Sequence, residues 1–331
     1  MTTVKKYLSL IKFAHTIFAL PFALIGFFLG LLKPFPPISS TPGWHTFIFS
    51  SSHQLKDIGS DDSLMMQLIT GANPYFLIIK YLFLVIGCMV FARSAAMAYN
   101  RYLDANFDAN NPRTAVREIP AGILKANSVL LFVVANCLLF IACCFFINRI
   151  CFYLSPVALF VVLFYSYTKR FTALCHLVLG VGLSLAPIGA YLAVTGQFNL
   201  LPILFSCTVL FWVSGFDIIY ALQDEAFDRS QNLHSIPAAL GKTKALRVSE
   251  LLHLLSAACV VYAGVYGEFG TWYWIGVGIF TGLLIYQHLL VKPNDLRKVN
   301  MAFFTTNGIA SVLFAAFVIT DLFLSKNNFH I

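Results

Sequence analysis

Charge is what this sequence has least of. Lysine, arginine, aspartate and glutamate make up 11% of the residues, whereas hydrophobic residues make up 59%, and the mean hydropathy is +0.79. Such a composition lies far outside the range of soluble globular proteins and indicates a membrane protein. The formal net charge of +8 is then expected to reflect membrane topology, not binding to nucleic acid.

Cysteine patterns typical of metal or redox sites are also missing. The eight cysteines form no CxxC pair and none has a metal-ligand spacing to a histidine. Seven fall inside apolar runs and Cys151 lies at the end of one, as expected of small buried hydrophobic residues. A signal-peptide cleavage site is missing too, so the apolar run after Lys5, Lys6 and Lys12 is predicted to be a retained first span.

Long apolar runs, by contrast, are abundant. A helix needs about 20 apolar residues to cross a bilayer, and nine runs approach or exceed this length. They are residues 10–32, 76–98, 127–147, 151–168, 172–194, 201–223, 245–266, 270–290 and 300–324. The sequence therefore predicts an all-α polytopic membrane protein of nine transmembrane helices, with residues 1–331 forming a single integral-membrane domain in contact with membrane lipid.

Basic residues occur in every second loop between these runs. The members of this set are Lys5, Lys6, Arg101, Arg113, Arg117, Lys125, Lys169, Arg170, Arg229, Lys242, Lys244, Arg247, Lys292, Arg297 and Lys298. Because cytoplasmic loops are enriched in lysine and arginine, these loops and the N-terminus are predicted to be cytoplasmic and the C-terminus outside, in a bacterial inner or plasma membrane. The one long polar segment, residues 33–75, is predicted to be an extended outside loop.

A first cluster of polar residues follows the second apolar run. At helical spacings of seven, four and four residues, one face carries Arg93, Asn100, Asp104 and Asp108. Asn110-Asn111-Pro112 is expected to end that helix. Arg113, Arg117 and Lys125 then add positive charge within a short loop. Oxygen ligands followed by cations are typical of a metal-bridged phosphate site.

A second cluster repeats this arrangement. Asp217, Asp224 and Asp228 are spaced by seven and four residues, and Asp224 lies 120 residues after Asp104. Each cluster ends an apolar run, and each is followed by a polar loop that ends in a Pro-Ala turn, which indicates a weak internal duplication. Residues 100–125 and 224–244 are predicted to be two cytoplasmic active-site loops.

Five carboxylates beside a membrane need a compensating charge, because each costs several kcal/mol there. Hard oxygen ligands without histidine or cysteine favour Mg²⁺, which is commonly held by one or two carboxylates together with substrate phosphates. Arg113, Arg117, Lys169 and Arg93 are expected to hold the outer phosphate oxygens and to stabilise the leaving group. The predicted reaction is ionisation of a carbon–oxygen bond in a diphosphate ester.

Other polar residues in the apolar runs receive weaker assignments. Tyr165 and Lys169 lie one helical turn apart and are expected to point together into the bundle. His176 is interpreted as a satisfied buried histidine, not a metal ligand. Five further residues near the ends of the last three runs are interpreted as snorkelling to the interface, without a chemical role: Glu250, His253, His288, Asn307 and Asp321.

These motifs resemble those of the UbiA superfamily of intramembrane prenyltransferases. The matching patterns are NxxxDxxxD with RTxxR (Asn100, Asp104, Asp108, Arg113, Thr114, Arg117), DxxYxxxDxxxD (Asp217, Tyr220, Asp224, Asp228) and YxxxKR (Tyr165, Lys169, Arg170). The resemblance covers nearly the whole chain and implies nine spans. It also implies a polyprenyl tail in a hydrophobic tunnel open to lipid and an aromatic acceptor that attacks the allylic carbon.

The resemblance also implies a role for each matched residue. Mg²⁺ ligands are expected at Asp104, Asp108, Asp224 and Asp228, and these four together with Asp217 are the expected catalytic carboxylates. The expected diphosphate-binding residues are Asn100, Arg93, Arg113, Arg117, Tyr165 and Lys169. Arg170 is the expected partner of the acceptor's carboxylate.

Within the superfamily, the phrases NPRTAVREIPAG and DEAFDRSQNLHSIPAALG most resemble 4-hydroxybenzoate polyprenyltransferases of quinone biosynthesis. Glu118 departs from this pattern, since many members have proline there, and so does the long insertion from Lys33 to Asn73. A naphthoate acceptor, as in menaquinone synthesis, and other acceptors of the family therefore stay open. A transporter is the alternative from a different class, although carriers place their charges near the bilayer midplane.

Overall fold

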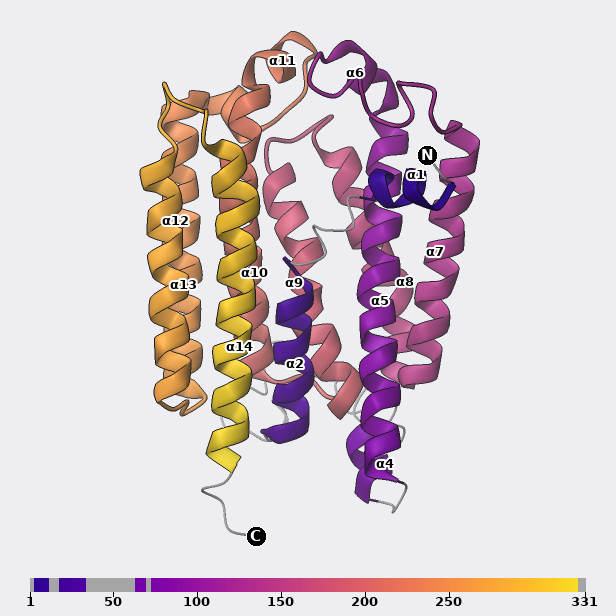
Figure 1. Cartoon of the computed structure of the whole chain (residues 1–331), viewed down its shortest axis with the longest axis vertical. Helices are drawn as coiled ribbons and strands as arrows, with labels where there is room; N and C mark the ends of the chain where they lie inside the picture. The colour runs from indigo at the N-terminus through magenta and orange to yellow at the C-terminus, as the bar shows by residue number, and fades with distance from the viewer. Residues whose placement is uncertain (1–2, 12–17, 34–62, 70–72, 327–331) are drawn as a thin grey trace, which may run out of the picture.

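The structure is a computed structural model that describes residues 3–11, 18–33, 63–69 and 73–326. In chain order the helices of this part are α1 (Thr3–Leu10), α2 (Leu20–Leu32), α4 (Leu64–Ile69), α5 (Pro74–Leu103), α6 (Ala105–Asn110), α7 (Ala126–Ile147), α8 (Arg149–Thr168), α9 (Cys175–Thr195), α10 (Leu200–Ala221), η3 (Leu222–Asp224), α11 (Glu225–Ser230), α12 (Ile236–Tyr266), α13 (Thr271–Leu290), η4 (Met301–Thr306) and α14 (Asn307–Lys326). The long helices run side by side as a bundle (Figure 1).

Eight helical stretches of the described residues are long and apolar enough to cross a membrane. They match eight of the nine predicted spans. The remaining one, residues 10–32, corresponds to α2, an apolar helix of 13 residues, and residues 12–17 before it lie outside the described part. The predicted all-α polytopic membrane fold is confirmed, whereas most of the predicted outside loop, residues 34–62 and 70–72, lies outside the described residues.

Capping side chains explain where several spans begin. The side chain of Asn73 accepts from the N–H groups of Tyr75 and Phe76 at the start of α5, where Pro74 occupies the first turn. Asn148 and Asn199 cap α8 and α10 in the same way. Each cap satisfies donors that the helix itself leaves unpaired, so these boundaries are encoded locally in the sequence.

Close helix contacts depend on small residues, as expected for membrane bundles. A Cβ atom at Gly180 of α9 would overlap the hydroxyl of Ser214 and the carbonyl oxygen of Leu210 in α10. The packed interior between α2, α10, α13 and α14 is rich in aromatic rings, with Phe22, Trp212 and Phe314 fully buried. These contacts hold the second half of the bundle beneath its polar end.

The two carboxylate motifs lie at one end of the bundle. Figure 1 shows α6 and α11 next to each other at that end, with α1 lying nearby, and α4 and the C-terminal end of α14 at the opposite end. The two motifs are therefore on one side of the molecule, as a shared site requires. The placement of α1 and of the C-terminal end of α14 at opposite ends agrees with an odd number of crossings.

The helix that carries each motif breaks at the central aspartate. Asp104, with φ −89° and ψ 4°, ends α5 and begins α6. Asp224, with φ −102° and ψ 2°, ends η3 and begins α11 in nearly the same conformation. The expected straight helical face is therefore interrupted in both motifs, and the similar break supports the internal duplication.

The snorkelling interpretation is wrong for three of the five residues to which it was applied. His253, Asn307 and Asp321 are buried inside the bundle. Asp321, for example, accepts from the backbone N–H groups of Gly270 and Tyr273 at 2.8 and 3.2 Å. Internal hydrogen-bond partners satisfy these groups in place of interfacial water.

Candidate active site

Asp104 lies at the centre of the first motif, where α5 gives way to α6. Its side chain is 3% exposed and is held by two cations. The ammonium Nζ of Lys169 lies 3.0 Å from Oδ2, and Nη2 of Arg170 lies 3.3 Å from Oδ1. The amide of Asn100 also donates to Oδ2, at 3.3 Å. The predicted residues Asn100, Asp104 and Lys169 are thus brought together, and Arg170 joins them.

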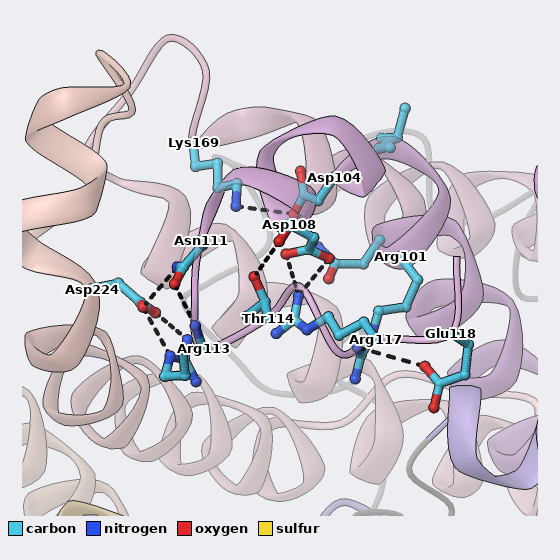
Figure 2. Close-up of polar contacts among 12 residues, drawn as sticks. Arg101, Asp104, Asp108, Asn111, Arg113, Thr114, Arg117, Glu118, Lys169 and Asp224 are labelled. Atoms are coloured by element: carbon cyan, nitrogen blue, oxygen red, sulfur yellow. Dashed lines mark hydrogen bonds and ion pairs between the residues drawn. The ribbon is translucent and has the colours of Figure 1, made fainter. Parts of the chain in front are cut away.

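Asp108 is carried one turn further, on α6. Both of its carboxylate oxygens accept from Nη1 of Arg117, at 2.7 and 2.8 Å. The hydroxyl of Thr114 donates to the backbone carbonyl of Asp108 at 3.2 Å. The loop after α6 therefore folds back onto the helix. As a result, Arg117, the second arginine of RTxxR, neutralises Asp108, the second acid of NxxxDxxxD (Figure 2).

Arg113 joins the two motifs. Figure 2 shows its guanidinium directed at Asp224, to which Nε donates at 3.0 Å and Nη2 donates a second bond. Its Nη1 donates to the hydroxyl of Tyr220 at 3.1 Å, and the amide of Asn111 lies 3.4 Å from Asp224 Oδ1. Burial alone would lower the pKa of Arg113, but Asp224 and Tyr220 outweigh it and raise that pKa. The pair of hydrogen bonds is the geometry that a planar guanidinium makes with a carboxylate.

The other two acids of the second motif have neutral partners. Nδ1 of His176 lies 2.7 Å from Oδ2 of Asp217, and the backbone N–H of Ile236 donates to Nε2 of the same ring at 3.3 Å. Because Nε2 accepts, the proton is assigned to Nδ1, which donates to Asp217. Asp228 accepts from the hydroxyl of Ser235 at 2.8 Å. The interpretation of His176 as a satisfied buried histidine is confirmed.

An apolar cavity of about 370 Å³ lies among α5, α7, α8 and α9. Its lining consists of apolar residues and cysteines except for Arg93, Ser155 and Tyr165. Arg93 lies 11 residues before Asp104, about 16 Å along a helix that rises about 1.5 Å per residue. Its Nε atom is buried without a hydrogen-bond partner among the described residues. Arg93 and Tyr165 therefore face the cavity, and Arg93 lies apart from the carboxylates of the first motif.

Several site residues were not identified from the sequence. Asn111 was treated as part of a helix break, and Tyr220 received no role. Ser235 was overlooked although Pro237 follows it in the first turn of α12, where proline is favoured. Glu118, noted only as a departure, accepts from the hydroxyl of Ser9 in α1 at 2.5 Å. Only the hydrogen-bonding pattern of the folded chain reveals these partners.

The carboxylates are compatible with Mg²⁺ in their chemistry. In the part of the chain described, no three histidine, cysteine or acidic side chains converge as a preformed metal cage. Mg²⁺ does not need one, since it is often bound by one or two carboxylates with water and substrate phosphate. Each motif offers two aspartates at one end of its broken helix, Asp104 with Asp108 and Asp224 with Asp228. This all-oxygen donor set suits a hard cation.

Comparison with known proteins identifies the family of the chain. The model of the UbiA prenyltransferase family matches residues 63–309. The 4-hydroxybenzoate octaprenyltransferase of Nitrosomonas europaea is 29% identical over 240 residues, which are 72% of this chain and 82% of that protein. The enzyme of that name from Nitrosospira multiformis is 30% identical over 233 residues, covering 70% and 80%.

Solved structures show the same fold. The apo structure of a UbiA homolog from Aeropyrum pernix K1 has a TM-score of 0.70 and 25% identity, covering 94% of this chain and 98% of that one. A UbiA homolog from Archaeoglobus fulgidus bound to DMAPP and Mg²⁺ has a TM-score of 0.63 and 17% identity, covering 96% and 99%. Because the family model spans most of the sequence and the relatives are aligned over most of their length, the chain belongs to the UbiA prenyltransferase family and is an integral-membrane prenyltransferase.

Proposed function

We propose that this enzyme transfers a polyprenyl group from a polyprenyl diphosphate to an aromatic acid, 4-hydroxybenzoate, with Mg²⁺ as cofactor, in quinone biosynthesis. The observation that carries the proposal is the layer of alternating carboxylates and cations above an apolar cavity. The layer suits a diphosphate with its metal, and the cavity suits a hydrocarbon chain. The acceptor is taken from the relatives, which bear the name 4-hydroxybenzoate octaprenyltransferase.

The ion pairs of the site offer the partners that a metal diphosphate needs. Asp104 with Asp108, and Asp224 with Asp228, would hold Mg²⁺, which supplies positive charge against the leaving diphosphate. Arg113, Arg117 and Lys169 now donate to these carboxylates. The same nitrogen atoms bind phosphate oxygens when substrate arrives, because phosphate offers the same acceptor chemistry.

The transfer breaks one bond and forms another. The bond between the allylic carbon and the diphosphate oxygen breaks, and its electrons leave with the diphosphate. A ring carbon of the acceptor then attacks the allylic carbon, and the ring loses a proton. We assign that proton to Asp217, whose Oδ2 lies 2.7 Å from Nδ1 of His176, since a positioned carboxylate is a common general base.

The acceptor's carboxylate requires a cation, and two arginines have a buried N–H without a partner among the described residues. These are Nε of Arg93 and Nη1 of Arg170. Arg170 already donates through Nη2 to the carbonyl of Leu103 at 2.9 Å and lies near Asp104. Arg93 has no ion pair with a carboxylate in the described part of the chain, and it faces the cavity. We therefore place the acceptor's carboxylate at Arg93, with the assignment to Arg170 as the alternative.

A single assay tests the acceptor and its arginine together. The purified enzyme is given Mg²⁺, a radiolabelled polyprenyl diphosphate, and 4-hydroxybenzoate, a dihydroxynaphthoate or 4-methylphenol. Arg93→Ala is expected to raise the KM for 4-hydroxybenzoate about 10- to 100-fold, the equivalent of about 1.5–3 kcal/mol, and to leave 4-methylphenol nearly unaffected. The same pattern in Arg170→Ala alone would move the carboxylate to Arg170. Preferred transfer to the naphthoate would make the enzyme a menaquinone-type prenyltransferase.

The polar end of the bundle carries the basic loops, and we propose that it faces the cytoplasm of a bacterial inner membrane. Single cysteines at Asn110 and Gln231, introduced into a cysteine-free variant, should then be shielded from an impermeant reagent added to intact cells. A cysteine at Glu268 should react. Labelling of Asn110 and Gln231 but not of Glu268 would reverse the proposed orientation.

A further inference from the structure

A π-helical turn, η4, precedes α14. Such turns widen the helix by one residue, are rare, and often occur at functional sites. Two side chains close this turn. The amide nitrogen of Asn307 donates to the carbonyl oxygens of Ala302 and Phe303 at 3.2 and 2.9 Å, and the hydroxyl of Thr306 donates to the carbonyl of Met301 at 3.3 Å. The widened turn is therefore held by specific hydrogen bonds.

Asn307 is itself fixed from two neighbouring helices. Its carbonyl oxygen accepts from Nε1 of Trp212 in α10 at 2.9 Å and from Nε2 of Gln287 in α13 at 2.6 Å. All three side chains are 0% exposed. With two donors and two acceptor positions in use, the amide of Asn307 is fully satisfied. Polar groups at this depth are costly unless every partner is present.

The π turn presents an aromatic ring to the active site. The ring of Phe303 packs on that of Tyr220 with centroids 4.2 Å apart and on Phe216 at 5.2 Å. The hydroxyl of Tyr220 accepts from Arg113, which in turn binds Asp224. A continuous series of contacts therefore leads from Asn307 through Phe303 and Tyr220 to the link between the two motifs.

Hydrogen bonds between helices account for only part of the bonding of Asn307. The bonds from Trp212 and Gln287 join three helices, but they use the carbonyl oxygen of Asn307 alone. Its amide nitrogen donates within its own helix, to the carbonyl oxygens of Ala302 and Phe303 in the π turn. These two bonds tie Asn307 to the backbone segment that carries the Phe303 ring.

We propose that Asn307 is a positioning residue for prenyl diphosphate binding. It holds the π turn, which keeps Phe303 against Tyr220 and so keeps the Tyr220 hydroxyl at Arg113. The inference rests on the proposed function, because Arg113 is there assigned to the diphosphate. Replacement of Asn307 should therefore weaken binding of the prenyl diphosphate and leave binding of the aromatic acceptor unchanged.

The test compares Asn307→Leu with Ser256→Ala. Ser256 is an equally buried control, whose hydroxyl donates to the carbonyl of Thr208 at 2.9 Å between α12 and α10, away from the π turn. Asn307→Leu is expected to raise the KM for the prenyl diphosphate about tenfold and to leave the KM for the acceptor unchanged, whereas Ser256→Ala should change neither. Equal loss on the donor and acceptor sides, or an unchanged donor KM, would overturn the proposal.

A double-mutant cycle tests the path through Tyr220. Tyr220→Phe removes the hydroxyl that accepts from Arg113. If Asn307 acts through Tyr220, the double variant should bind the donor no more weakly than the worse single variant, whereas additive losses would place Asn307 on another path. If Asn307→Leu does not fold, Phe303→Leu replaces it, since this change keeps the buried amide network and removes the ring contact.

A binding readout separates this inference from the proposed function. Thermal stabilisation by geranyl diphosphate with Mg²⁺ reports donor binding without any acceptor. If the wild-type protein prenylates no aromatic acid but is stabilised, the proposed acceptor fails, and the comparison of Asn307→Leu with Ser256→Ala still decides the inference. Stabilisation of Asn307→Leu equal to that of the wild type would refute it.

Discussion

The two carboxylate motifs have nearly the same backbone conformation, but their carboxylates have different hydrogen-bond and ion-pair partners. In both, the helix breaks at the central aspartate, Asp104 or Asp224, with nearly the same φ and ψ, and a helix of six residues follows. Asp104 and Asp108 are each paired with cations from the loops after α6 and α8. Asp217 and Asp228 are held by an imidazole and a hydroxyl, and Asp224 is bound by Arg113 from the first motif.

This difference shows how a duplicated element can become asymmetric. The backbone break places two carboxylates at one helix end in each half, but most of the neutralising charge comes from the loops after α6 and α8. Arg113 is the exception, because it follows the first motif in the sequence and binds Asp224 of the second. The second motif therefore depends on Arg113 of the first for its charge balance, whereas the first motif is balanced by the loops after α6 and α8.

Metal removal is expected to have the largest effect and to act on both motifs alike. A chelator should abolish prenyl transfer, and Mg²⁺ should restore it, because neither pair of carboxylates can bind a diphosphate without a bridging cation. The measurement is product formation from a labelled polyprenyl diphosphate with EDTA and after Mg²⁺ is added back. Full activity in EDTA would contradict the shared metal site.

Replacement of the central aspartate is expected to lower the thermal stability of the protein to different extents in the two motifs. Asp104→Ala and Asp224→Ala should each reduce kcat/KM by on the order of a hundredfold or more, since each removes a proposed metal ligand. Asp104→Ala should also lower the Tm more, because it leaves Lys169 and Arg170 without their shared carboxylate. Similar Tm values for the two variants would contradict the proposed difference in charge balance between the two motifs.

Replacement of the two loop arginines by lysine is expected to have a smaller effect on kcat/KM. The difference between them tests whether Arg113 links the two motifs. Arg113 donates through three nitrogens to Asp224 and Tyr220, a pattern that lysine cannot reproduce, so Arg113→Lys should cost about tenfold in kcat/KM. Arg117 contacts Asp108 through one nitrogen, so the matched control Arg117→Lys should cost no more than about threefold. Equal losses would show that Arg113 has no special bridging role.

The smallest effect is expected at Ser235, where the second motif meets α12. Ser235→Ala removes both a helix cap and the hydroxyl bound to Asp228, at a cost of about 1 kcal/mol in unfolding free energy. Activity should fall only a few-fold, because Asp228 keeps its carboxylate. Ser235→Thr retains the hydroxyl and serves as the control, and both variants are measured by thermal unfolding and transfer assays.

Much of the fold follows from the sequence because membrane helices are encoded locally. Length, apolar composition and the caps at Asn73, Asn148 and Asn199 define spans without reference to distant residues. The alternation of basic loops correctly predicted that Asp104 and Asp224 lie at one end of the bundle. What the sequence missed was the break of each helix at these residues, because an i, i+4 pattern of acids is the same in straight and broken helices.

By itself, the sequence determined the membrane class and eight of the predicted spans, and it led to the prediction of which carboxylates and cations form the site. Only the tertiary structure decided the pairing: Arg113 with Asp224, Arg170 with Asp104, His176 with Asp217, and Asn307 with Trp212 and Gln287. These partners lie on different helices or on the loops between them, and spacing within one helix says nothing about its rotation toward another. That rotation is set by close packing at residues such as Gly180, because buried polar groups find partners only where packing brings helices together.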